Sequence, residues 1–398
     1  MRVLVVNTGS SSLKLRLLGP DDHLDATLDL EQWHADTASD ELLTFTSRLD
    51  GVGAVGHRVV HGGDRFTTAT LIDDSVAKAL AALSDLAPLH QPRAVAAIAA
   101  VRAMLPGVPQ VACFDTAFHA GLPPAAATYA LPATWRARFG LRRYGFHGLS
   151  HAYAARRAAQ LLAAAAGPVT AAPPGPPSRP VSPQRLRMVV CHLGAGASLA
   201  AVHGGRSVDT TMGFTPMEGL VMATRPGNLD PGVLIWLLQH ADLPLAEVAD
   251  RLEHGAGLAG LAELRGGSGD MRDVRLAAEA GDPRATLALD VYIHRLRREV
   301  AAMAAAMDGL DVLVFTGGIG EHDPAVRSSA AAGLRFLGVR IDPERNADAR
   351  GDADISAEGA PARSLVITAR EDLEVARQVR GLLAGPLRQA PHHRRAGG

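Results

Sequence analysis

The feature that most constrains the fold is a short apolar run that ends in a turn of small residues. It occurs at VLVVNTGSSS (3–12), VVCHLGAGAS (189–198) and VLVFTGGIGE (312–321). A short apolar run bounded by glycines is typical of a buried strand. Because the pattern recurs in both halves of the chain, it predicts two similar α/β domains that face one cleft.

The segments between these runs alternate between strand-like and helix-like patterns, which favours an α/β fold. Strands are expected at 1–7, 13–18, 52–60, 108–114, 363–368 and, on both sides of a glycine turn, within 188–202. Helices are expected at 75–87, 92–105, 149–166 and 282–307, and a last one follows 368. Residues 7–12 then form the turn of a hairpin.

Two segments lack any such pattern. Seven of the seventeen residues in 167–183 are proline, which is typical of a surface linker or a disordered loop. We therefore expect that deleting 170–182 leaves activity intact. The last residues, 387–398, are expected to form a frayed tail.

The composition gives no sign of a nucleic-acid or membrane partner. The chain has 40 basic and 41 acidic residues among 398, a balance that gives no reason to expect a nucleic acid or an acidic membrane as partner. Neither a signal peptide nor a membrane span is recognisable, so a cytoplasmic location is expected. Cys113 and Cys191 lie in apolar runs and are expected to be buried free thiols.

The loop NTGSSSLK (7–14) permits two interpretations. Its small residues suit a surface hairpin, but converging backbone N–H groups and serine hydroxyls can also bind phosphate. The spacing of a Walker A loop is absent. Lys14 is notable because the only other lysine is Lys78, and a compact ammonium suits a phosphate oxygen at close range.

Several isolated residues are candidates for chemistry, each with a purely structural alternative. Arg58 ends a buried strand, where a guanidinium needs an anion such as a substrate carboxylate or a protein carboxylate. Asp115 also ends a strand, and His147 precedes a helix. Arg225 lies in a long segment, 208–232, without clear periodicity, and such segments are usually functional.

Taken in order, the motifs resemble those of the acetate kinase family. The matching segments are NTGSSSLK, HRVVHGG, FDTAFH, RYGFHGLSH, HLGAGAS, DTTMGFTPMEGL, TRPGNLDP and FTGGIGE, and the likeness runs from residue 3 to about 378. The resemblance implies two RNase-H-like domains of the actin–hexokinase type around a central cleft. It also implies a homodimer that interconverts ATP and acetate with ADP and acetyl phosphate, using Mg²⁺ or Mn²⁺. NTGSSSLK would then be both a hairpin and a phosphate loop.

The resemblance also implies domain limits. The first domain would comprise 1–117, completed by a C-terminal helix at about 373–386. The second would comprise 118–372 and hold the nucleotide site.

The resemblance assigns roles to individual residues. Catalysis would depend on Arg58, Asp115, His147 and Arg225. The phosphates and the adenosine would contact Asn7, Ser10, Ser12, Lys14, His192, Gly194, Gly196, Asp270, Arg272, Gly317, Gly318, Gly320 and His322. Acetate and the phosphoryl group would contact Arg58, Val60, Leu89, His90, Phe146, Pro216 and Arg225. The metal ion would be bound by Asn7 and Glu371.

Some positions depart from the family pattern. Ala195 and His322 each stand where asparagine is usual, both near the nucleotide; further departures are Leu149, Ala223, Pro226 and Asn228. Two alternatives to an acetate kinase stay open. One is a propionate or butyrate kinase of the same family, because the sequence does not give the volume of the acyl pocket. The other, suggested by Ala195 and His322, is a weakly catalytic, nucleotide-binding regulatory protein.

Overall fold

The computed structural model describes residues 1–9, 12–31, 33, 40–87, 90–166 and 185–385. The chain forms two compact units, one of Met1–Phe114 with Asp372–Gly398 (unit 1) and one of Asp115–Glu371 (unit 2). The predicted limits were 117/118 and 372/373. The proline-rich segment, the tail, Ser10 and Leu89 lie outside the described residues.

Unit 1 contains a six-stranded sheet with the order β3-β2-β1-β4-β6-β5. The strands are β1 (Arg2–Thr8), β2 (Leu13–Leu18), β3 (Leu24–Leu30), β4 (Val52–Val59), β5 (Thr70–Leu71) and β6 (Gln110–Phe114). β1, β2 and β3 are antiparallel, whereas β4 and β6 run parallel to β1 and β5 runs antiparallel to β6.

The sheet of unit 2 repeats this topology in the order β11-β12-β10-β7-β8-β9. Its strands are β7 (Arg187–Leu193), β8 (Ala197–His203), β9 (Arg206–Thr210), β10 (Val312–Thr316), β11 (Ala353–Asp354) and β12 (Arg363–Val366). Here too, three antiparallel strands are followed by two parallel ones and a short antiparallel edge strand. The shared order supports the interpretation of the repeated strand-and-turn pattern as two similar domains.

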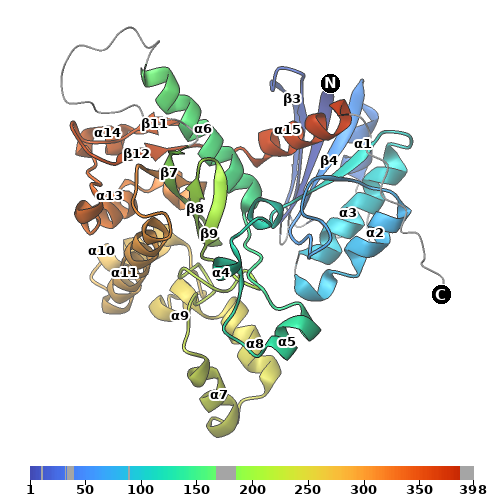
Figure 1. The fold of residues 1–398 in the computed structure, drawn as a ribbon. Helices are drawn as coiled ribbons and strands as arrows, with labels where there is room; N and C mark the ends of the chain where they lie inside the picture. The colour runs from blue at the N-terminus through green and yellow to red at the C-terminus, as the bar shows by residue number, and fades with distance from the viewer. Residues whose placement is uncertain (10–11, 32, 34–39, 88–89, 167–184, 386–398) are drawn as a thin grey trace. The chain divides into compact units, whose positions relative to one another are not determined.

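Helices cover both faces of the first sheet. Val55 of β4 packs in the same core as Ala97 and Val101 of α3 (Gln91–Met104). The next residue, Gly56, faces the other way because side chains alternate along a strand. A Cβ on Gly56 would lie 2.5 Å from Val375 in α15 (Glu371–Ala384), so only glycine lets this helix pack here. Figure 1 shows α15 beside the strands of unit 1, although it follows unit 2 in the chain.

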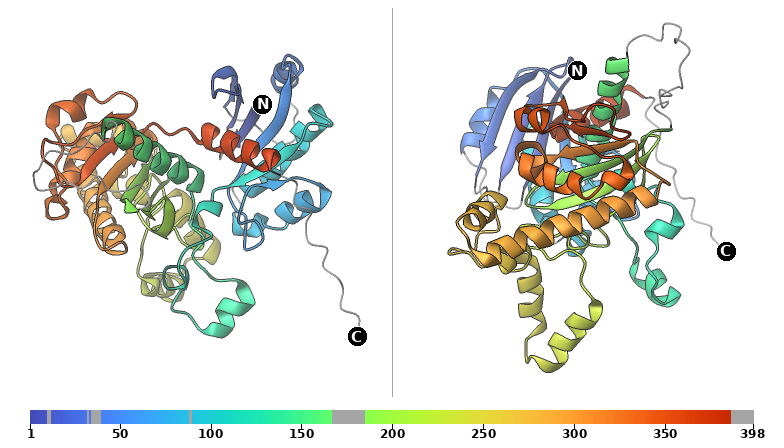
Figure 2. Two further views of the ribbon diagram at one scale, coloured as in Figure 1. Left: turned by 45° about the horizontal axis from the view of Figure 1, so that its top comes forward. Right: turned by 90° about the vertical axis from the view of Figure 1, so that its left-hand side faces the viewer.

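The central strands of the second sheet are also buried. β10 is buried along its whole length, as expected for a parallel strand with both faces covered. α6 (Gly148–Ala166) packs against β7 and β10, and the long α11 (Pro283–Ala305) packs against β7 and β8 (Figure 2).

The remaining helices are mostly short. In unit 1 they are α1 (Asp40–Ser47), α2 (Asp74–Ala81) and the 3-10 turn η1 (Ser84–Leu86). In unit 2 they are η2 (Ala117–His119), α4 (Pro124–Ala127), α5 (Ala133–Phe139), α7 (Pro231–His240), α8 (Leu245–His254), α9 (Gly257–Ala262), α10 (Met271–Glu279), α12 (Gly317–His322), α13 (Pro324–Ala332), η4 (Arg335–Leu337) and α14 (Pro343–Asp348).

Two sequence expectations need correction. The helix expected at 75–87 ends at Ala81 and resumes only as the turn Ser84–Leu86. The glycine turn expected after β10 is instead the start of a helix, α12, which follows the strand directly. Cys113 and Cys191 are buried and free, as predicted. No helix in the described ranges has the length and apolar character needed to cross a membrane.

Candidate active site

Three predicted residues of unit 1 lie at one end of its sheet. Asn7 pairs with Lys14 across the β1–β2 hairpin, so the two side chains project from the same face. Arg58, near the end of the neighbouring β4, donates from Nη1 to Oδ1 of Asn7 at 3.2 Å. The hairpin interpretation of NTGSSSLK is confirmed, since Gly9 N donates to Ser12 O at 2.8 Å.

Two more predicted residues of unit 1 follow nearby segments. Val60 is buried directly after β4, with 7% of its surface exposed. His90 is the N-cap residue of α3, and its side chain does not cap that helix. A Cβ on Gly62 would lie 2.2 Å from the carbonyl oxygen of Phe66, so the HGG sequence after Val60 provides a turn that a larger residue would disrupt.

In unit 2, His147 occupies an unusual backbone conformation. Its φ is +54°, in the left-handed region that non-glycine residues rarely adopt. It immediately precedes α6, and its carbonyl oxygen accepts a hydrogen bond from His151 N at 2.9 Å. Such strain is retained where the surrounding structure fixes it, and it is common at functional sites.

His147 and Arg225 both approach Gly196. A Cβ on Gly196 would be 2.7 Å from Nη2 of Arg225 and 3.4 Å from Nε2 of His147. Gly196 belongs to the turn between β7 and β8, whereas Arg225 comes from the aperiodic segment 208–232. The structure therefore brings together three predicted residues from distant parts of the sequence.

The segment that carries Arg225 is held by backbone contacts. Nη1 of Arg225 donates to the carbonyl oxygen of Pro216 at 2.7 Å. A Cβ on Gly257, at the start of α9, would lie 2.3 Å from the carbonyl oxygen of Met222, so α9 packs directly on this segment. Burial lowers the pKa of Arg225, and the charge of Glu253 opposes that effect.

A partly buried ion pair supports the same segment. Arg143 donates to Glu218 at 2.6 Å, and the hydroxyl of Tyr129 donates to the same carboxylate at 2.5 Å. Arg143 also donates to the carbonyl oxygens of Thr211 and Met212. Burial alone would lower the pKa of Arg143, but Glu218 outweighs burial and raises it. The ion pair thus connects the residues before α6 with the Arg225 segment.

Three further predicted residues lie beside His147. The ring of His192 lies against that of His147, with 4.4 Å between centroids and an angle of 30° between the ring planes. Asp115 is 1% exposed, and its carbonyl oxygen accepts a hydrogen bond from Gly148 N at 2.9 Å. Phe146 is 2% exposed.

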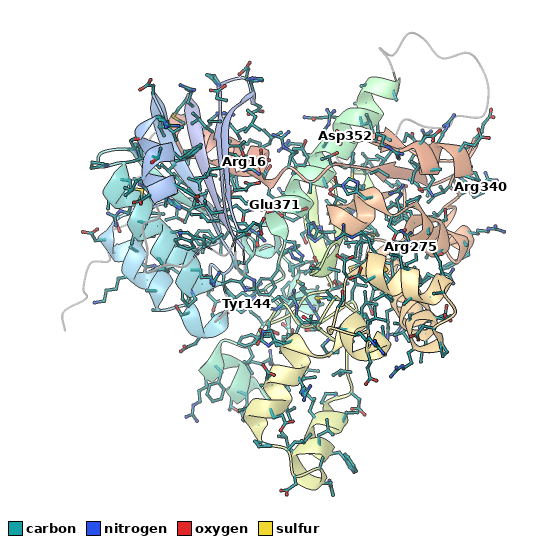
Figure 3. All side chains as sticks on the ribbon, turned by 180° about the vertical axis from the view of Figure 1, so that it is seen from behind. Arg16, Tyr144, Arg275, Arg340, Asp352 and Glu371 are labelled. Atoms are coloured by element: carbon teal, nitrogen blue, oxygen red, sulfur yellow. The ribbon has the colours of Figure 1, made fainter. Side chains whose placement is uncertain are left out.

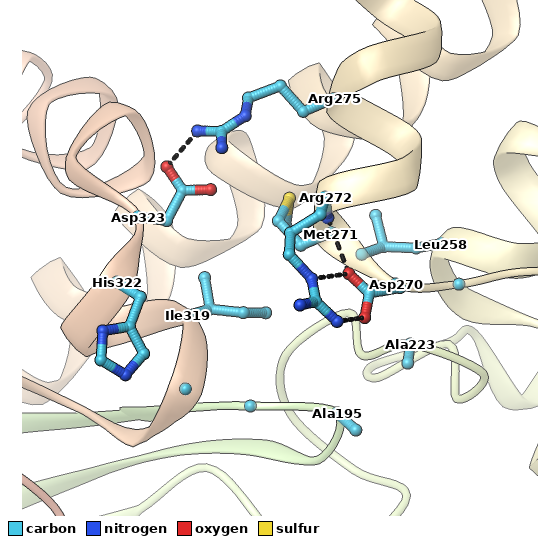
Figure 4. Close-up of a pocket in the computed structure, with 13 residues that line it drawn as sticks. Ala195, Ala223, Leu258, Asp270, Met271, Arg272, Arg275, Ile319, His322 and Asp323 are labelled. Atoms are coloured by element: carbon cyan, nitrogen blue, oxygen red, sulfur yellow. Dashed lines mark hydrogen bonds and ion pairs between the residues drawn. The ribbon is translucent and has the colours of Figure 1, made fainter.

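A cavity of about 410 Å³ lies at the carboxyl ends of β7 and β10 (Figure 4). Its lining consists of Gly194, Ala195, Ala223, Leu258, Gly269, Asp270, Met271, Arg272, Arg275, Gly318, Ile319, His322 and Asp323. The volume is that of a small-molecule site, and the lining is mostly apolar with a few charged groups. The two predicted adenosine ligands, Asp270 and Arg272, form an ion pair at 2.7 Å that lowers the pKa of Asp270.

The glycines of α12 leave space on the cavity side. No described atom lies within 4 Å of a Cβ built on Gly318, whereas Gly317 and Gly320 are buried against the strands. The carboxylate of Glu321 accepts hydrogen bonds from Gly317 N at 3.0 Å and Ala369 N at 2.9 Å. Glu321 therefore connects α12 to the segment that leads to Glu371.

The residues predicted to bind metal supply oxygen donors. Glu371 offers a carboxylate and Asn7 an amide oxygen, which are hard ligands of the kind that Mg²⁺ prefers. No cluster of three or more histidine, cysteine or acidic side chains suited to a metal occurs among the described residues. Such a donor set fits an ion that shares its coordination with water and substrate phosphates.

Several residues that line the cavity escaped the sequence analysis. Arg275 donates to Asp323 at 2.6 Å, as Figure 4 shows, and Arg275 is also labelled in Figure 3. The sequence could have indicated Arg275, because it lies three residues after Arg272 and a helix places residues at this spacing on a similar face. Asp323 caps α13 through Ala325 N and Val326 N. Nothing in the sequence beyond their apolar side chains indicates that Leu258 and Ile319 line the cavity.

Comparison with known proteins gives a family match. A model described as the acetokinase family matches residues 35–377. A curated acetate kinase of Synechococcus sp. (strain JA-2-3B'a(2-13)) is 44% identical over 427 residues, covering 97% of this chain and all of the relative. The acetate kinase of Leifsonia xyli subsp. xyli (strain CTCB07) is 43% identical, covering 94% of this chain and 97% of the relative.

Solved structures give the same picture. The acetate kinase of Porphyromonas gingivalis superposes with a TM-score of 0.83 at 33% identity, covering 96% of this chain and 99% of that one. A propionate kinase of Francisella tularensis subsp. tularensis SCHU S4 superposes with a TM-score of 0.82, also at 33% identity, covering 95% and 98%.

Proposed function

Because this chain belongs to the acetokinase family and is therefore a phosphotransferase, we propose that it is an acetate kinase whose acceptor is the carboxylate of acetate. In this reaction a carboxylate oxygen forms a bond to the γ-phosphorus of ATP while the bond from that phosphorus to the β,γ-bridging oxygen breaks. ADP leaves and acetyl phosphate forms, and the reverse reaction regenerates ATP. A carboxylate is already ionised at neutral pH, so no general base is needed.

The observation that carries the proposal is the approach of His147 and Arg225 to the same turn. Both lie at Gly196, and the adjacent Gly194 and Ala195 line the cavity of about 410 Å³. Phosphoryl transfer requires alignment and positive charge around the equatorial oxygens more than covalent chemistry. We assign to Arg225 the stabilisation of charge on these oxygens and to His147 a hydrogen bond to one of them.

Residues of unit 1 complete the assignment. Arg58 binds the acetate carboxylate, which its planar guanidinium suits, and Asn7 holds the Arg58 side chain through the 3.2 Å hydrogen bond. Lys14, Ser12 and Ser10 bind phosphate oxygens, and His90 donates to the phosphoryl group. These roles rest on the family resemblance and on the chemistry of the side chains.

The cavity of unit 2 binds the nucleotide in this proposal. The backbone at Gly194 and Gly318 lies next to the phosphates and the ribose, and Asp270 and Arg272 contact the adenosine. Ala195 and His322 both line this cavity, so the two departures from the family pattern affect the nucleotide and not the acceptor. ATP is accordingly the donor to test first, with pyrophosphate as the alternative.

Asn7 and Glu371 would hold the divalent metal ion, for which we propose Mg²⁺ with Mn²⁺ as a substitute. Such an ion neutralises charge on the phosphates when bound. Asp115 is assigned to orient the arginines or the metal ion.

Propionate is a second acceptor to consider. The propionate kinase of Francisella tularensis superposes as well as the acetate kinase of Porphyromonas gingivalis, with TM-scores of 0.82 and 0.83. Val60, Phe146 and Pro216 are the described residues that we assign to the acyl pocket. One added methylene typically changes binding by about 1–3 kcal/mol, so both acids are expected to react at different rates.

We also propose a homodimer. Among the described residues of α7, none is buried, although the helix reads PGVLIWLLQH. Ile235 is 55% exposed and Trp236 is 57% exposed. An apolar helix of this kind is expected to be covered, here by a second copy of the chain.

The test is a hydroxamate assay with ATP, Mg²⁺ and acetate, run beside propionate, butyrate and the variant Arg225→Ala. We expect acetyl hydroxamate from the wild type and a loss of about 3 kcal/mol of transition-state stabilisation, or roughly 100-fold in rate, in the variant. The absence of product with every acid and with either ATP or pyrophosphate would overturn the proposal in favour of a binding protein.

A further inference from the structure

A chain of hydrogen bonds extends from His147 into the core of unit 2. Nδ1 of His147 lies 3.0 Å from Oγ of Ser198, and Nε2 of His151 lies 2.8 Å from the same oxygen. Ser198 and His151 are both fully buried, each with 0% exposure. One serine hydroxyl therefore links two imidazoles, and it has a single proton with which to donate.

The position of the proton on His151 follows from its surroundings. Burial holds the pKa of His151 well below its usual value, and the neighbouring His119 and His192 act in the same direction, so the ring is neutral and carries one N–H. Within the described part of the chain, Nδ1 of His151 is buried and has no hydrogen-bond partner. A buried N–H without an acceptor is rarer than an unused acceptor, so the proton belongs on Nε2.

The remaining directions follow from the partners of Ser198. Nε2–H of His151 donates to Ser198 Oγ. Among the described residues the only other partner of this hydroxyl is Nδ1 of His147, so its buried proton is donated there. An imidazole that accepts at Nδ1 must carry its own proton at Nε2 when neutral. Nε2 of His147 is the ring atom nearest to Gly196, 3.4 Å from its Cβ position, on the side where Arg225 lies.

We propose that His151 and Ser198 are positioning residues that fix His147 in the Nε2–H tautomer, with this N–H directed at the transferring phosphoryl group. The inference rests on the proposed function for the role of that N–H, but the tautomer itself is a property of the free protein. Neither Ser198 nor His151 touches substrate in this account. They act by preventing the His147 ring from flipping or from placing its proton on Nδ1.

The first test measures the tautomer directly, without substrate. Two-bond ¹H–¹⁵N correlation spectra of protein labelled with ¹⁵N-histidine are recorded at a pH where imidazoles are neutral, and the His147 signals are assigned by their absence in His147→Gln. We expect a protonated-type shift at Nε2 and an unprotonated-type shift at Nδ1. In Ser198→Ala, both nitrogens should move toward the averaged values of a tautomer mixture. A proton on Nδ1 in the wild type overturns the proposal, whatever the activity.

The second test is kinetic and includes matched variants. Ser198→Ala and His151→Leu should each lower kcat about 10–100-fold with little change in KM for acetate or ATP, by analogy with other residues that orient a functional histidine. His151→Gln keeps an N–H donor near the original Nε2 position and should recover most of the activity. The control is Ser207→Ala, which removes a comparable buried bond of 2.8 Å to Nδ1 of His119.

The outcomes separate this inference from the proposed function. Equal kcat for Ser198→Ala and Ser207→Ala, with the wild type active, overturns the positioning role and leaves the acetate kinase proposal intact. An inactive wild type overturns the proposed function and with it the role in turnover, while the spectra still decide the tautomer.

Discussion

Arg225 is fixed by the segment that carries it, because its Nη1 donates to the carbonyl oxygen of Pro216 at 2.7 Å. This bond leaves the other end of the guanidinium, Nη2, next to Gly196. Within the described residues the guanidinium is therefore oriented by a carbonyl oxygen and not by an ion pair, and its position is sensitive to the side chain at residue 196.

The first prediction concerns Gly196→Ala. The new Cβ would lie 2.7 Å from Nη2 of Arg225, so the guanidinium must move. A displacement of about 1 Å at a catalytic group can cost about 100-fold in rate, and we expect a loss of that order in kcat. The control is Gly121→Ala, where no described atom lies within 4 Å of the new Cβ. Equal hydroxamate rates for both variants would contradict the role of Arg225.

The second prediction concerns the cavity. At Gly318 a Cβ meets no described atom within 4 Å, so a larger side chain fits without disturbing the fold and occupies space in the cavity. Gly318→Leu is expected to raise KM for ATP at least about tenfold, the factor that corresponds to 1.4 kcal/mol, and to leave KM for acetate unchanged. An unaltered KM for ATP would show that the nucleotide binds elsewhere.

The third prediction concerns the support of α12. Arg327 is 1% exposed and donates to the carbonyl oxygens of Gly320 and Glu321 and to Asn346. Arg327→Met leaves these acceptors buried without a donor, so the free energy of unfolding should fall by about 3 kcal/mol. The matched change Arg340→Met removes an exposed bond to Gly359 and should cost less than about 0.5 kcal/mol. Urea unfolding followed by circular dichroism measures both, and equal midpoints would contradict the prediction.

The fourth prediction concerns pH. Burial lowers the pKa of His57 in unit 1 and of His119 in unit 2 to about 4, from 6.5. Above pH 6.5 these rings are neutral in both the folded and unfolded states and do not affect stability. Between pH 6.5 and 4 only the unfolded chain binds the proton, so the free energy of unfolding falls as the pH decreases, by roughly 3 kcal/mol for each group.

Unfolding midpoints in urea across this pH range test the prediction against His57→Gln. The variant should have a shallower pH dependence than the wild type. Parallel curves would mean that His57 is not buried as a neutral group.

The fifth prediction concerns association. Trp236→Glu places a charge on the exposed face of α7 and should convert the proposed homodimer to monomers in sedimentation velocity experiments. Phe336→Glu is the control, since Phe336 is 73% exposed in η4 and away from α7 in the sequence. A wild type that is already monomeric would overturn the dimer.

Much of the fold could be predicted from the sequence. The α/β class with two RNase-H-like domains is confirmed by the two sheets of equal topology and by the superposition on the Porphyromonas gingivalis acetate kinase. The apolar runs were informative because β1, β7 and β10 are buried on both faces. The strand β3 was not predicted because it lies at the sheet edge and most of its residues are at least partly exposed. The helix α7 was not predicted because its apolar residues do not follow a helical period with one buried face.

The site was predictable to a lesser degree. The sequence motifs indicated Gly196, His147 and Arg225 as site residues, but their proximity is known only from the structure. Arg275 and Glu321 were missed because their function in the structure is to pair with groups from other elements, Asp323 in one case and Ala369 N in the other. The left-handed conformation of His147 is likewise invisible in its residue type, since nothing in a histidine indicates a positive φ.

The packing of α15 on Gly56 has a consequence for how the chain is made. Unit 2 is contiguous, so a ribosome delivers all of it in one stretch, whereas unit 1 needs Val375 and Val379 from the last helix to cover Gly56. During synthesis the strands of the first sheet are therefore made before the helix that covers Gly56, and α15 follows only after all of unit 2 has been translated. Unit 2 can therefore fold first, and unit 1 completes its packing only once α15 has been made.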